Sequence, residues 1–229
     1  MESLSRKERE RLNRRREMLQ AGIRVFAEKG YERASIEEIA QRAEFGKGTL
    51  YLYFPKGKEE MLRAIVQDLA EEEFQLVENV FLQSQEQQRS FEQTFRAFIR
   101  AYLDHYHQEK DHFRLVVKVL NRLMLSDEDA LKELVLSLKA KTISRFSGFL
   151  EEAMQRGEVR SFHAEALTHM IFGNLHGYIM YDTFLHNPPL PCTPTQISPA
   201  NDAQEWLCLL LLHGISQQPS STAVLPRSI

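Results

Sequence analysis

The stretch "SIEEIAQRAEFGKGTLYLYF", Ser35–Phe54, contains two short helical segments joined by a turn. In the first segment, isoleucines and alanines recur with the spacing of one helix face. Ser35 followed three residues later by Glu38 is the pattern of an N-terminal capping box. A turn is predicted over residues 44–46, and a second short helix over 47–53, because a proline and a glycine interrupt the chain soon afterwards.

Longer helices are predicted on both sides of this stretch. Upstream, apolar residues recur at helical spacing from Leu12 to Phe26, and Gly30 follows as a stop signal. Downstream, a long helix starts near Lys58. Helix, short helix, tight turn and short helix, in this order, form a helix-turn-helix. The remaining periodic segments are also helical, which predicts an all-α fold, with helices over about 91–106, 113–124, 127–156, 164–186 and 199–215.

The second short helix has the composition of a surface that meets DNA. Leu50 and Phe54, four residues apart, are expected to face the core. The second helix of a helix-turn-helix enters the major groove, where small residues permit close approach and polar groups meet base edges or phosphates. Lys58 would add an ammonium at the positive end of the next helix, a favourable seat for a phosphate. The alternative is a glycine-rich loop with surface tyrosines. The residues predicted to face DNA in the second helix are Lys47, Gly48, Thr49, Tyr51 and Tyr53.

The charge distribution along the chain is uneven. The formal net charge is −3, but residues 1–58 hold 14 Lys and Arg against 9 Asp and Glu, whereas the remainder holds 15 against 23. A basic N-terminal part on an acidic body indicates that only the N-terminal part meets a polyanion.

From Met18 to Met61, "MLQAGIRVFAEKGYERASIEEIAQRAEFGKGTLYLYFPKGKEEM" resembles the tetracycline-repressor (TetR) family of bacterial one-component regulators. At the turn, that family often has Ala-Gly-Val-Ser where this chain has Ala43-Glu44-Phe45-Gly46, so Glu44 stands where glycine commonly takes a positive φ. The resemblance implies base contacts from Lys47, Gly48, Thr49 and Tyr51, and phosphate contacts from Ser35, Tyr53 and Lys58.

The same resemblance implies a division into domains. Residues 1–57 are expected to form the helix-turn-helix DNA-binding domain, and residues 58–216 a helical domain for ligand binding and dimerisation. The segment "NPPLPCTPTQISP" holds five prolines and is read as an extended linker between the last two helices. Residues 217–229 are expected to be a disordered tail.

The last two predicted helices carry a candidate dimer interface. Two glycines four residues apart create a flat stripe suited to close helix packing, and the run "WLCLLLL" is apolar all round. In the family, these two helices form a four-helix interface between two subunits. The alternative is an ordinary intramolecular core. The predicted interface residues are Met170, Gly173, Gly177, Met180, Phe184, Trp206 and Leu210.

A second group of residues could line an effector cavity in the C-terminal domain. It combines aromatic and aliphatic side chains with a few hydroxyl, amide and carboxylate groups, as small-molecule sites do. Aromatic stripes at helical spacing are more often plain core, and that reading stays open. The predicted ligand-binding residues are Tyr102, Phe113, Asn121, Phe149, Met154, Asn174, Leu175, Tyr178 and Asp182.

Several classes of function have no support in the sequence. The two cysteines show no spacing typical of a metal site, and no nucleotide-binding or hydrolase motif is present. Surface or hydrogen-bonded histidines are the favoured reading of the eight histidines, and metal sensing by them stays open. The basic N-terminus has no apolar segment of the signal-peptide type, and the longest apolar run is too short to span a bilayer. We therefore expect a cytoplasmic protein that is not an enzyme and needs no metal, cofactor or membrane.

These observations predict a homodimeric, sequence-specific DNA-binding regulator. It would repress transcription from a palindromic operator, and a small apolar or aromatic effector would release it. An activator on the same scaffold stays possible, because promoter geometry is not encoded here. A helical ligand carrier or interaction module also stays possible, as does a helical enzyme that uses Tyr178, Asp182 and His176.

Overall fold

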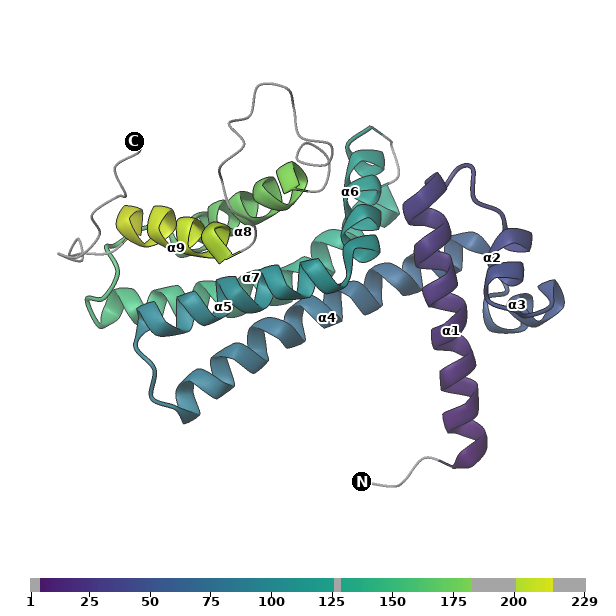
Figure 1. Cartoon of the computed structure of the whole chain (residues 1–229), viewed down its shortest axis with the longest axis horizontal. Helices are drawn as coiled ribbons and strands as arrows, with labels where there is room; N and C mark the ends of the chain where they lie inside the picture. The colour runs from purple at the N-terminus through teal and green to yellow at the C-terminus, as the bar shows by residue number, and fades with distance from the viewer. Residues whose placement is uncertain (1–4, 126–128, 183–200, 216–229) are drawn as a thin grey trace. The chain divides into compact units, whose positions relative to one another are not determined.

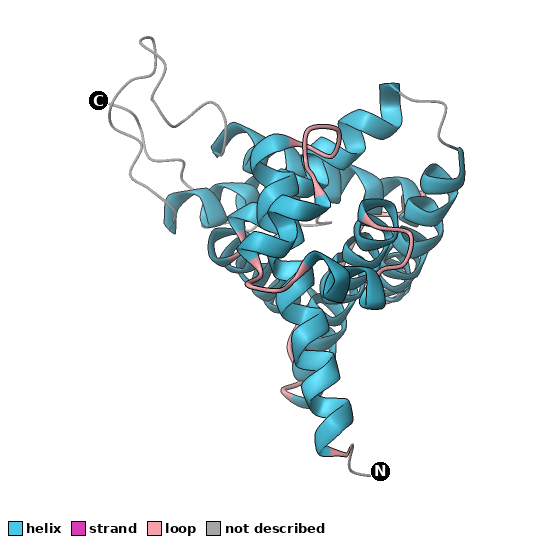
Figure 2. Ribbon diagram, turned by 90° about the vertical axis from the view of Figure 1, so that its right-hand side faces the viewer, coloured by secondary structure: helices cyan, strands magenta, loops and turns pink. Residues whose placement is uncertain are grey.

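The computed structural model describes residues 5–125, 129–182 and 201–215, and these residues form helices and no strand (Figures 1 and 2). This confirms the predicted all-α class. The helices are α1 (Arg6–Lys29), α2 (Ile36–Arg42), α3 (Lys47–Tyr53), α4 (Lys58–Glu86), α5 (Phe91–Gln108), α6 (Lys110–Leu125), α7 (Asp129–Gln155), α8 (Ala164–Met180) and α9 (Asn201–Ile215).

The chain divides into two compact units. Unit 1 comprises Met1–Glu72 and Gln108–Lys139, and unit 2 comprises Glu73–His107 and Ala140–Ile229. Two of the three divisions fall inside α4 and α7, so both helices contribute to both units, and the third falls before the last residue of α5. These units differ from the domains predicted from the sequence, and the predicted boundary after residue 57 stays a prediction. The proline-rich segment and the tail from residue 217 lie outside the described residues.

In unit 1, α2 and α3 pack beside α1 (Figure 1). The core is built from the apolar faces of α1 to α4, and Leu115 and Val119 of α6 join it. Gly22 allows α1 to approach α4 closely, because a Cβ atom there would lie 2.8 Å from the sulfur of Met61. Gly30 ends α1 with a φ of 78°, as its stop signal predicted.

The N-terminus of α2 differs in part from the predicted capping box. The Ser35 hydroxyl accepts a hydrogen bond from the Glu38 amide at 3.2 Å, as expected. The reciprocal bond is absent from this described helix end, and the Glu38 carboxylate instead pairs with Lys29 Nζ at 2.6 Å. The reciprocal half was therefore a wrong prediction: the cation at the end of α1 attracts the carboxylate away.

Unit 2 is held together by phenylalanine rings from α4, α5, α7 and α8. Phe81 stacks on Phe149 with ring centroids 4.5 Å apart, and Phe98 meets Phe146 at 4.7 Å. Such ring pairs bury large apolar areas and add a geometric preference of about 0.5–1.5 kcal/mol each. The aromatic side chains of α5 at Phe91, Phe95 and Phe98 are thus part of the core.

Candidate nucleic-acid interface

The turn between α2 and α3 positions the second short helix. Glu44 has a φ of 58°, so it adopts the conformation for which glycine is usually selected. The Phe45 amide donates to the Ala40 carbonyl at 3.0 Å, and the Phe45 ring packs against the core of unit 1. Backbone hydrogen bonding and a half-buried ring therefore hold the turn in the absence of a glycine at position 44.

Helix α3 has one buried face and one open face. Leu50 and Phe54 are buried, as predicted from their spacing. Lys47, Gly48 and Tyr51 are exposed, and Tyr51 retains 42% of its accessible surface. A Cβ atom on Gly48 would meet nothing within 4 Å, so this position can approach a DNA groove closely. The open face thus combines an ammonium, a bare backbone and a phenol.

Lys47 is held at this face by a short contact with the Glu37 carboxylate of α2. The hydrogen bond to Glu37 raises the pKa of Lys47, so its ammonium stays charged at neutral pH. Both side chains are more than half exposed, and an exposed pair of this kind contributes little to stability. A phosphate or base edge can therefore replace Glu37 as the partner of Lys47 at small cost.

The remaining predicted contacts differ in their accessibility. Thr49 is half-buried, and its amide donates to the Gly46 carbonyl at 2.9 Å. Tyr53 is half-buried and packs against the core of unit 1, so it projects outward less than predicted. Ser35 is half-buried and caps α2 through its side chain. Tyr53 and Ser35 are therefore less accessible to a partner than Lys47 and Tyr51.

The ammonium of Lys58 has a structural role that the sequence did not reveal. It donates to the carbonyls of Tyr31, Glu32 and Ala34 at 3.0, 3.2 and 3.3 Å. It also lies 4.5 Å from the centre of the Tyr31 ring. These contacts use its three donors to hold the loop between α1 and α2, so a phosphate contact by Lys58 would require an exchange of partners.

We expect Lys58→Met to destabilise the protein by about 2 kcal/mol, because hydrogen bonds from a charged donor are lost. This corresponds to a fall in Tm of about 4–8 °C for a chain of this size. Thermal melting followed by circular dichroism measures it. Lys56→Met, which removes an exposed lysine two residues away, is the matched control. Equal melting temperatures for both variants would mean that the carbonyl contacts do not stabilise the loop.

Leu52 is a residue of the open face that the sequence analysis missed. It retains 79% of its accessible surface and follows Gly48 by one helical turn. Exposed leucine on a short helix buries no apolar area within the chain, so its side chain is available to a partner. Its position four residues after Gly48 was the signal that could have identified it.

The predicted ligand-binding residues fall into different surroundings. The Tyr102 hydroxyl lies 3.0 Å from Glu73 and 2.8 Å from His176 Nε2, and the Tyr106 hydroxyl donates to Asp182 at 3.1 Å. Burial raises the pKa of Tyr102 well above its usual range, so this phenol stays protonated. The half-buried Tyr102, with Glu73 and His176, thus forms a polar cluster within unit 2, and the buried Tyr106 forms a separate polar pair with Asp182.

Other members of that predicted set do not join this cluster. Phe149 and Leu175 are buried within the apolar core, and Met154 is half-buried. Phe113 belongs to unit 1, and the side chain of Asn121 lies outside the described residues.

Asn174 lies on the exposed face of α8, where its amide donates to the Met170 carbonyl at 2.8 Å. Tyr178 is half-buried beside it, and burial raises the pKa of Tyr178 to about 12. Both residues line one surface hollow of unit 2 together with Gly173 and Gly177. Two predicted ligand residues therefore share a surface with the predicted dimer face.

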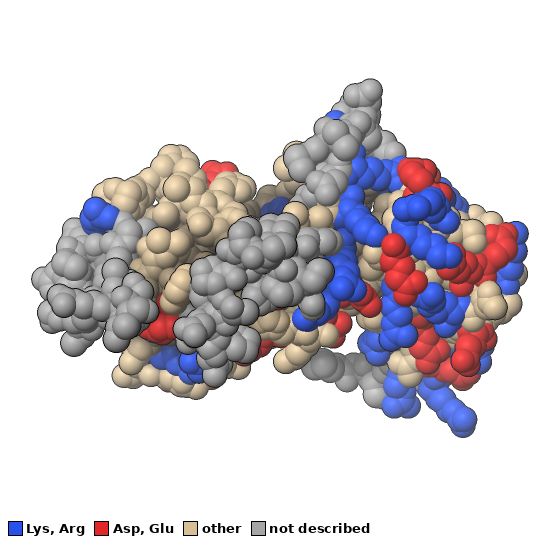
Figure 3. Space-filling view, turned by 45° about the horizontal axis from the view of Figure 1, so that its top comes forward, with Lys and Arg blue, Asp and Glu red and all other residues tan. Residues whose placement is uncertain are grey.

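The predicted dimer face is exposed and apolar in the single chain. Met170 and Leu210 retain 64% and 66% of their accessible surface, and Trp206 is also exposed. Leu207 and Cys208 are buried, so α9 has an inner and an outer face rather than being buried all round. Over α8 and α9, the visible described surface carries few charged side chains (Figure 3). Gly173, Gly177 and Met180 are exposed as well, whereas Phe184 lies outside the described residues.

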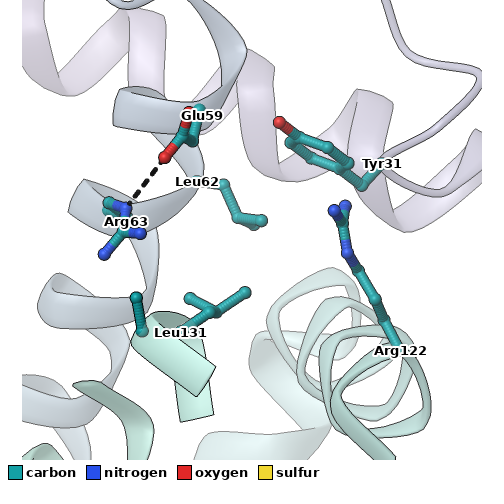
Figure 4. Close-up of a pocket in the computed structure, with 7 residues that line it drawn as sticks. Tyr31, Glu59, Leu62, Arg63, Arg122 and Leu131 are labelled. Atoms are coloured by element: carbon teal, nitrogen blue, oxygen red, sulfur yellow. Dashed lines mark hydrogen bonds and ion pairs between the residues drawn. The ribbon is translucent and has the colours of Figure 1, made fainter. Parts of the chain in front are cut away.

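A pocket of about 340 Å³ lies within unit 1 (Figure 4). Arg122 stacks over the Tyr31 ring at 4.0 Å and pairs with Glu32 at 3.1 Å, while Arg63 pairs with Glu59. None of the predicted ligand-binding residues whose side chains the structure describes lines this pocket. The residues that do are Tyr31, Glu59, Leu62, Arg63, Arg122, Ala130 and Leu131.

Two further properties concern the described residues only. None of their helices is long and apolar enough for a bilayer span. No group of three or more histidine, cysteine, aspartate or glutamate side chains comes together there as a set of metal ligands.

Comparison with known proteins gives matches to transcriptional regulators. Residues 18–65 match the family model described as bacterial regulatory proteins, tetR family. The chain is 24% identical over 179 residues to the HTH-type transcriptional regulator YhgD of Bacillus subtilis strain 168, covering 78% of this chain and 88% of YhgD. Residues 18–65, which match the family model, contain α2, α3 and the turn between them.

Solved structures share the fold over most of the chain. The fatty acid degradation regulator FadR from Bacillus halodurans aligns with a TM-score of 0.69 and 20% identity, covering 88% of this chain and 95% of that one. FadR from Bacillus subtilis, in complex with stearoyl-CoA, aligns with a TM-score of 0.67 and 22% identity, covering 86% and 97%. At these identities the likeness establishes the fold.

Proposed function

We propose that this chain is a homodimeric repressor that an effector releases from DNA, and the match of its residues 18–65 to the family model of bacterial regulatory proteins, tetR family, supports this. The observation that carries the proposal is the open face of α3 within the matched segment. There Lys47, Gly48 and Tyr51 are exposed, while Leu50 and Phe54 anchor the helix in the core. Such a helix can enter the major groove without unfolding any part of unit 1.

A second copy of the chain would supply the second recognition helix. The exposed apolar face of α8 and α9, with Met170, Trp206 and Leu210, supports this assembly, because large apolar patches commonly mark protein interfaces. A two-fold dimer places two recognition helices on half-sites about one helical turn apart, roughly 34–36 Å. The expected operator is therefore an inverted repeat.

We propose a long-chain acyl-CoA as the class of effector. The support is the relation to FadR of Bacillus subtilis, whose structure contains stearoyl-CoA, and the apolar interior of unit 2. The polar cluster of Tyr102, Glu73 and His176 offers hydrogen-bonding groups within that interior. To move the chain from 99% DNA-competent to 1%, the effector must prefer the other state by about 5.5 kcal/mol.

Two successive experiments test DNA binding and then release by the ligand. Selection from a random DNA pool should yield an inverted repeat. Stearoyl-CoA added to the complex should then lower operator affinity in a gel shift, whereas coenzyme A alone should not. If neither stearoyl-CoA nor shorter acyl-CoA changes the affinity, the acyl-CoA proposal is wrong, although the DNA-binding proposal stands. Enhanced promoter activity with operator-bound protein would indicate an activator instead of a repressor.

We expect Leu52 to contact the methyl group of a thymine in each half-site. Replacing one such thymine by uracil should reduce the binding free energy by about 0.8 kcal/mol per half-site. Over both half-sites this lowers the affinity roughly tenfold. The Leu52→Ala variant should be insensitive to the same replacement, as measured by fluorescence anisotropy across all thymine positions. The control is Leu82→Ala, which trims an exposed leucine of α4. Equal uracil sensitivity in Leu52→Ala and the native chain would exclude the contact.

A further inference from the structure

The N-terminal half of α1 is cationic and uncovered. Residues 6–16 contain seven Lys or Arg and two Glu, so they hold half of the basic residues found in residues 1–58. Every residue from 6 to 14 is exposed, including Leu12, which the helical pattern had suggested as part of the apolar face. The buried stretch of α1 begins only at Met18. This half of the helix, here called the arm (residues 6–16), extends about three turns beyond the core.

The arm is a capped helix and not a frayed end. The Ser5 hydroxyl accepts from the Glu8 amide at 3.3 Å, and the Glu8 carboxylate accepts from the Ser5 amide at 2.9 Å, which completes a capping box. Arg14 pairs with Glu10 one turn earlier at 2.5 Å. A helix that is polar on all sides is not stabilised by burying an apolar face. Its order must come from other interactions, such as caps and ion pairs, or from a partner.

Most of the charge on the arm is uncompensated. Arg14 pairs with Glu10, and Arg15 lies 3.6 Å from Asp68 of α4. Within the described residues, Arg6, Lys7, Arg9 and Arg11 make no ion pair. Four neighbouring cations without acidic partners repel one another in the free chain, so a polyanion would relieve the repulsion.

We propose that the arm is a second DNA contact, which binds backbone phosphates flanking the base pairs read by α3. This inference rests on the proposed function. The Arg15 guanidinium lies 5.7 Å from the centre of the Phe54 ring, at the end of α3, so the base of the arm adjoins the recognition helix. Lys7, Arg11 and Arg15 are spaced four residues apart and therefore follow one line along the helix. That line extends about 12 Å from Arg15 to Lys7.

The chemistry of the arm favours duplex DNA over a lipid surface. A helix that lies on a membrane needs a broad apolar face, and the arm carries a single large apolar residue, Leu12. Phosphate contacts need only positive charge and reach, because they carry no sequence information. The arm would thus add affinity and widen the contacted region without changing base preference.

The variant Lys7→Gln/Arg11→Gln tests the inference in the full chain. Each phosphate contact contributes about 0.9 to the magnitude of the slope of log affinity against log salt concentration. The variant loses two such contacts in each chain, so the magnitude of its slope should fall by about 1.8 per chain. Trimming the duplex from long flanks to the selected operator alone should weaken the native chain. The same trimming should leave the arm variant unchanged, and base preference should be identical in both. Arg89→Gln/Arg100→Gln, with the same change of charge in unit 2, is the matched control.

Several outcomes would overturn the inference. One is an arm variant that keeps the native salt slope and loses as much affinity as the native chain when the duplex is trimmed. Another is an arm variant that binds both duplexes equally more weakly than the native chain does. A third is a change in the preferred bases. Failure of the proposed function itself looks different, because the native chain would then select no sequence from the random pool.

Discussion

Replacing Thr49 and Tyr51 together by alanine is expected to abolish sequence-specific DNA binding while the chain stays folded. Both residues lie on α3 and neither is fully buried, so little core packing is lost. A good base contact contributes about 1–3 kcal/mol, and a dimer loses its contacts in both half-sites. Affinity for the operator should therefore fall at least about 100-fold, measured by gel shift at one fixed salt concentration.

The control for this double variant is Ser144→Ala/Phe162→Ala, which removes an exposed hydroxyl and an exposed ring in unit 2. It should bind the operator as the native chain does. Residual non-specific binding of the Thr49→Ala/Tyr51→Ala variant should keep its salt dependence, since the phosphate contacts remain. Unchanged specific affinity in that variant, with both proteins folded, would show that α3 does not read the bases.

The second large effect is expected from Met170→Glu/Leu210→Glu, which should separate the dimer into single chains. Both positions are exposed in the isolated chain, so the changes should not harm folding. In a dimer they would place four carboxylates in an apolar interface, and uncompensated buried charge costs several kcal/mol. The dimer dissociation constant should rise at least about 1,000-fold, or about 4 kcal/mol. Sedimentation should then report a single 26.7 kDa chain.

A matched control for charge insertion is available in α7. Leu136 is 70% exposed and belongs to unit 1, so Leu136→Glu adds the same group away from α8 and α9. It should leave both the sedimentation mass and operator binding unchanged. A native chain that sediments as a monomer at micromolar concentration would contradict the proposed assembly, as would a Met170→Glu/Leu210→Glu variant that stays dimeric.

The sequence predicted local structure well where neighbouring residues determine it. The bounds of α3, 47–53, follow from the glycine before Lys47 and the proline and glycine after Phe54, all within a few residues. Leu50 and Phe54 could be assigned to the core because a helix repeats every 3.6 residues. The stop signal at Gly30 was similarly local, and this glycine takes a positive φ.

Contacts between distant parts of the chain were not predictable in the same way. The three carbonyls that bind Lys58 lie 24 to 27 residues before it. Lys118 of α6 donates to the carbonyls of Ala27 and Glu28 at the end of α1, about 90 residues earlier. No periodicity reports such pairings, which explains why α6 was assigned to the C-terminal domain although its apolar face joins the core of unit 1.

In the candidate site, too, contacts between residues distant in sequence could not be predicted. Tyr102 and Asp182 were selected as polar groups on apolar helices, but their actual partners, Glu73 and Tyr106, depend on how α4, α5 and α8 pack. Asn174 was predicted to line an internal ligand cavity, but it lies on the exposed face of α8. A helical wheel does not define how wide the buried face of a helix is. Conversely, exposure revealed Leu52, whose apolar character had suggested nothing about DNA.

Tethered cleavage of operator DNA tests most directly whether two copies of α3 read the duplex as a pair. A DNA-cutting iron chelate would be attached at Gln41→Cys in a Cys192→Ser chain, since Gln41 is exposed beside the turn and Cys208 is buried. We predict two symmetric clusters of cuts about 10 base pairs apart. A single cluster, or the same cuts from a chelate at Ser144→Cys, would contradict the account.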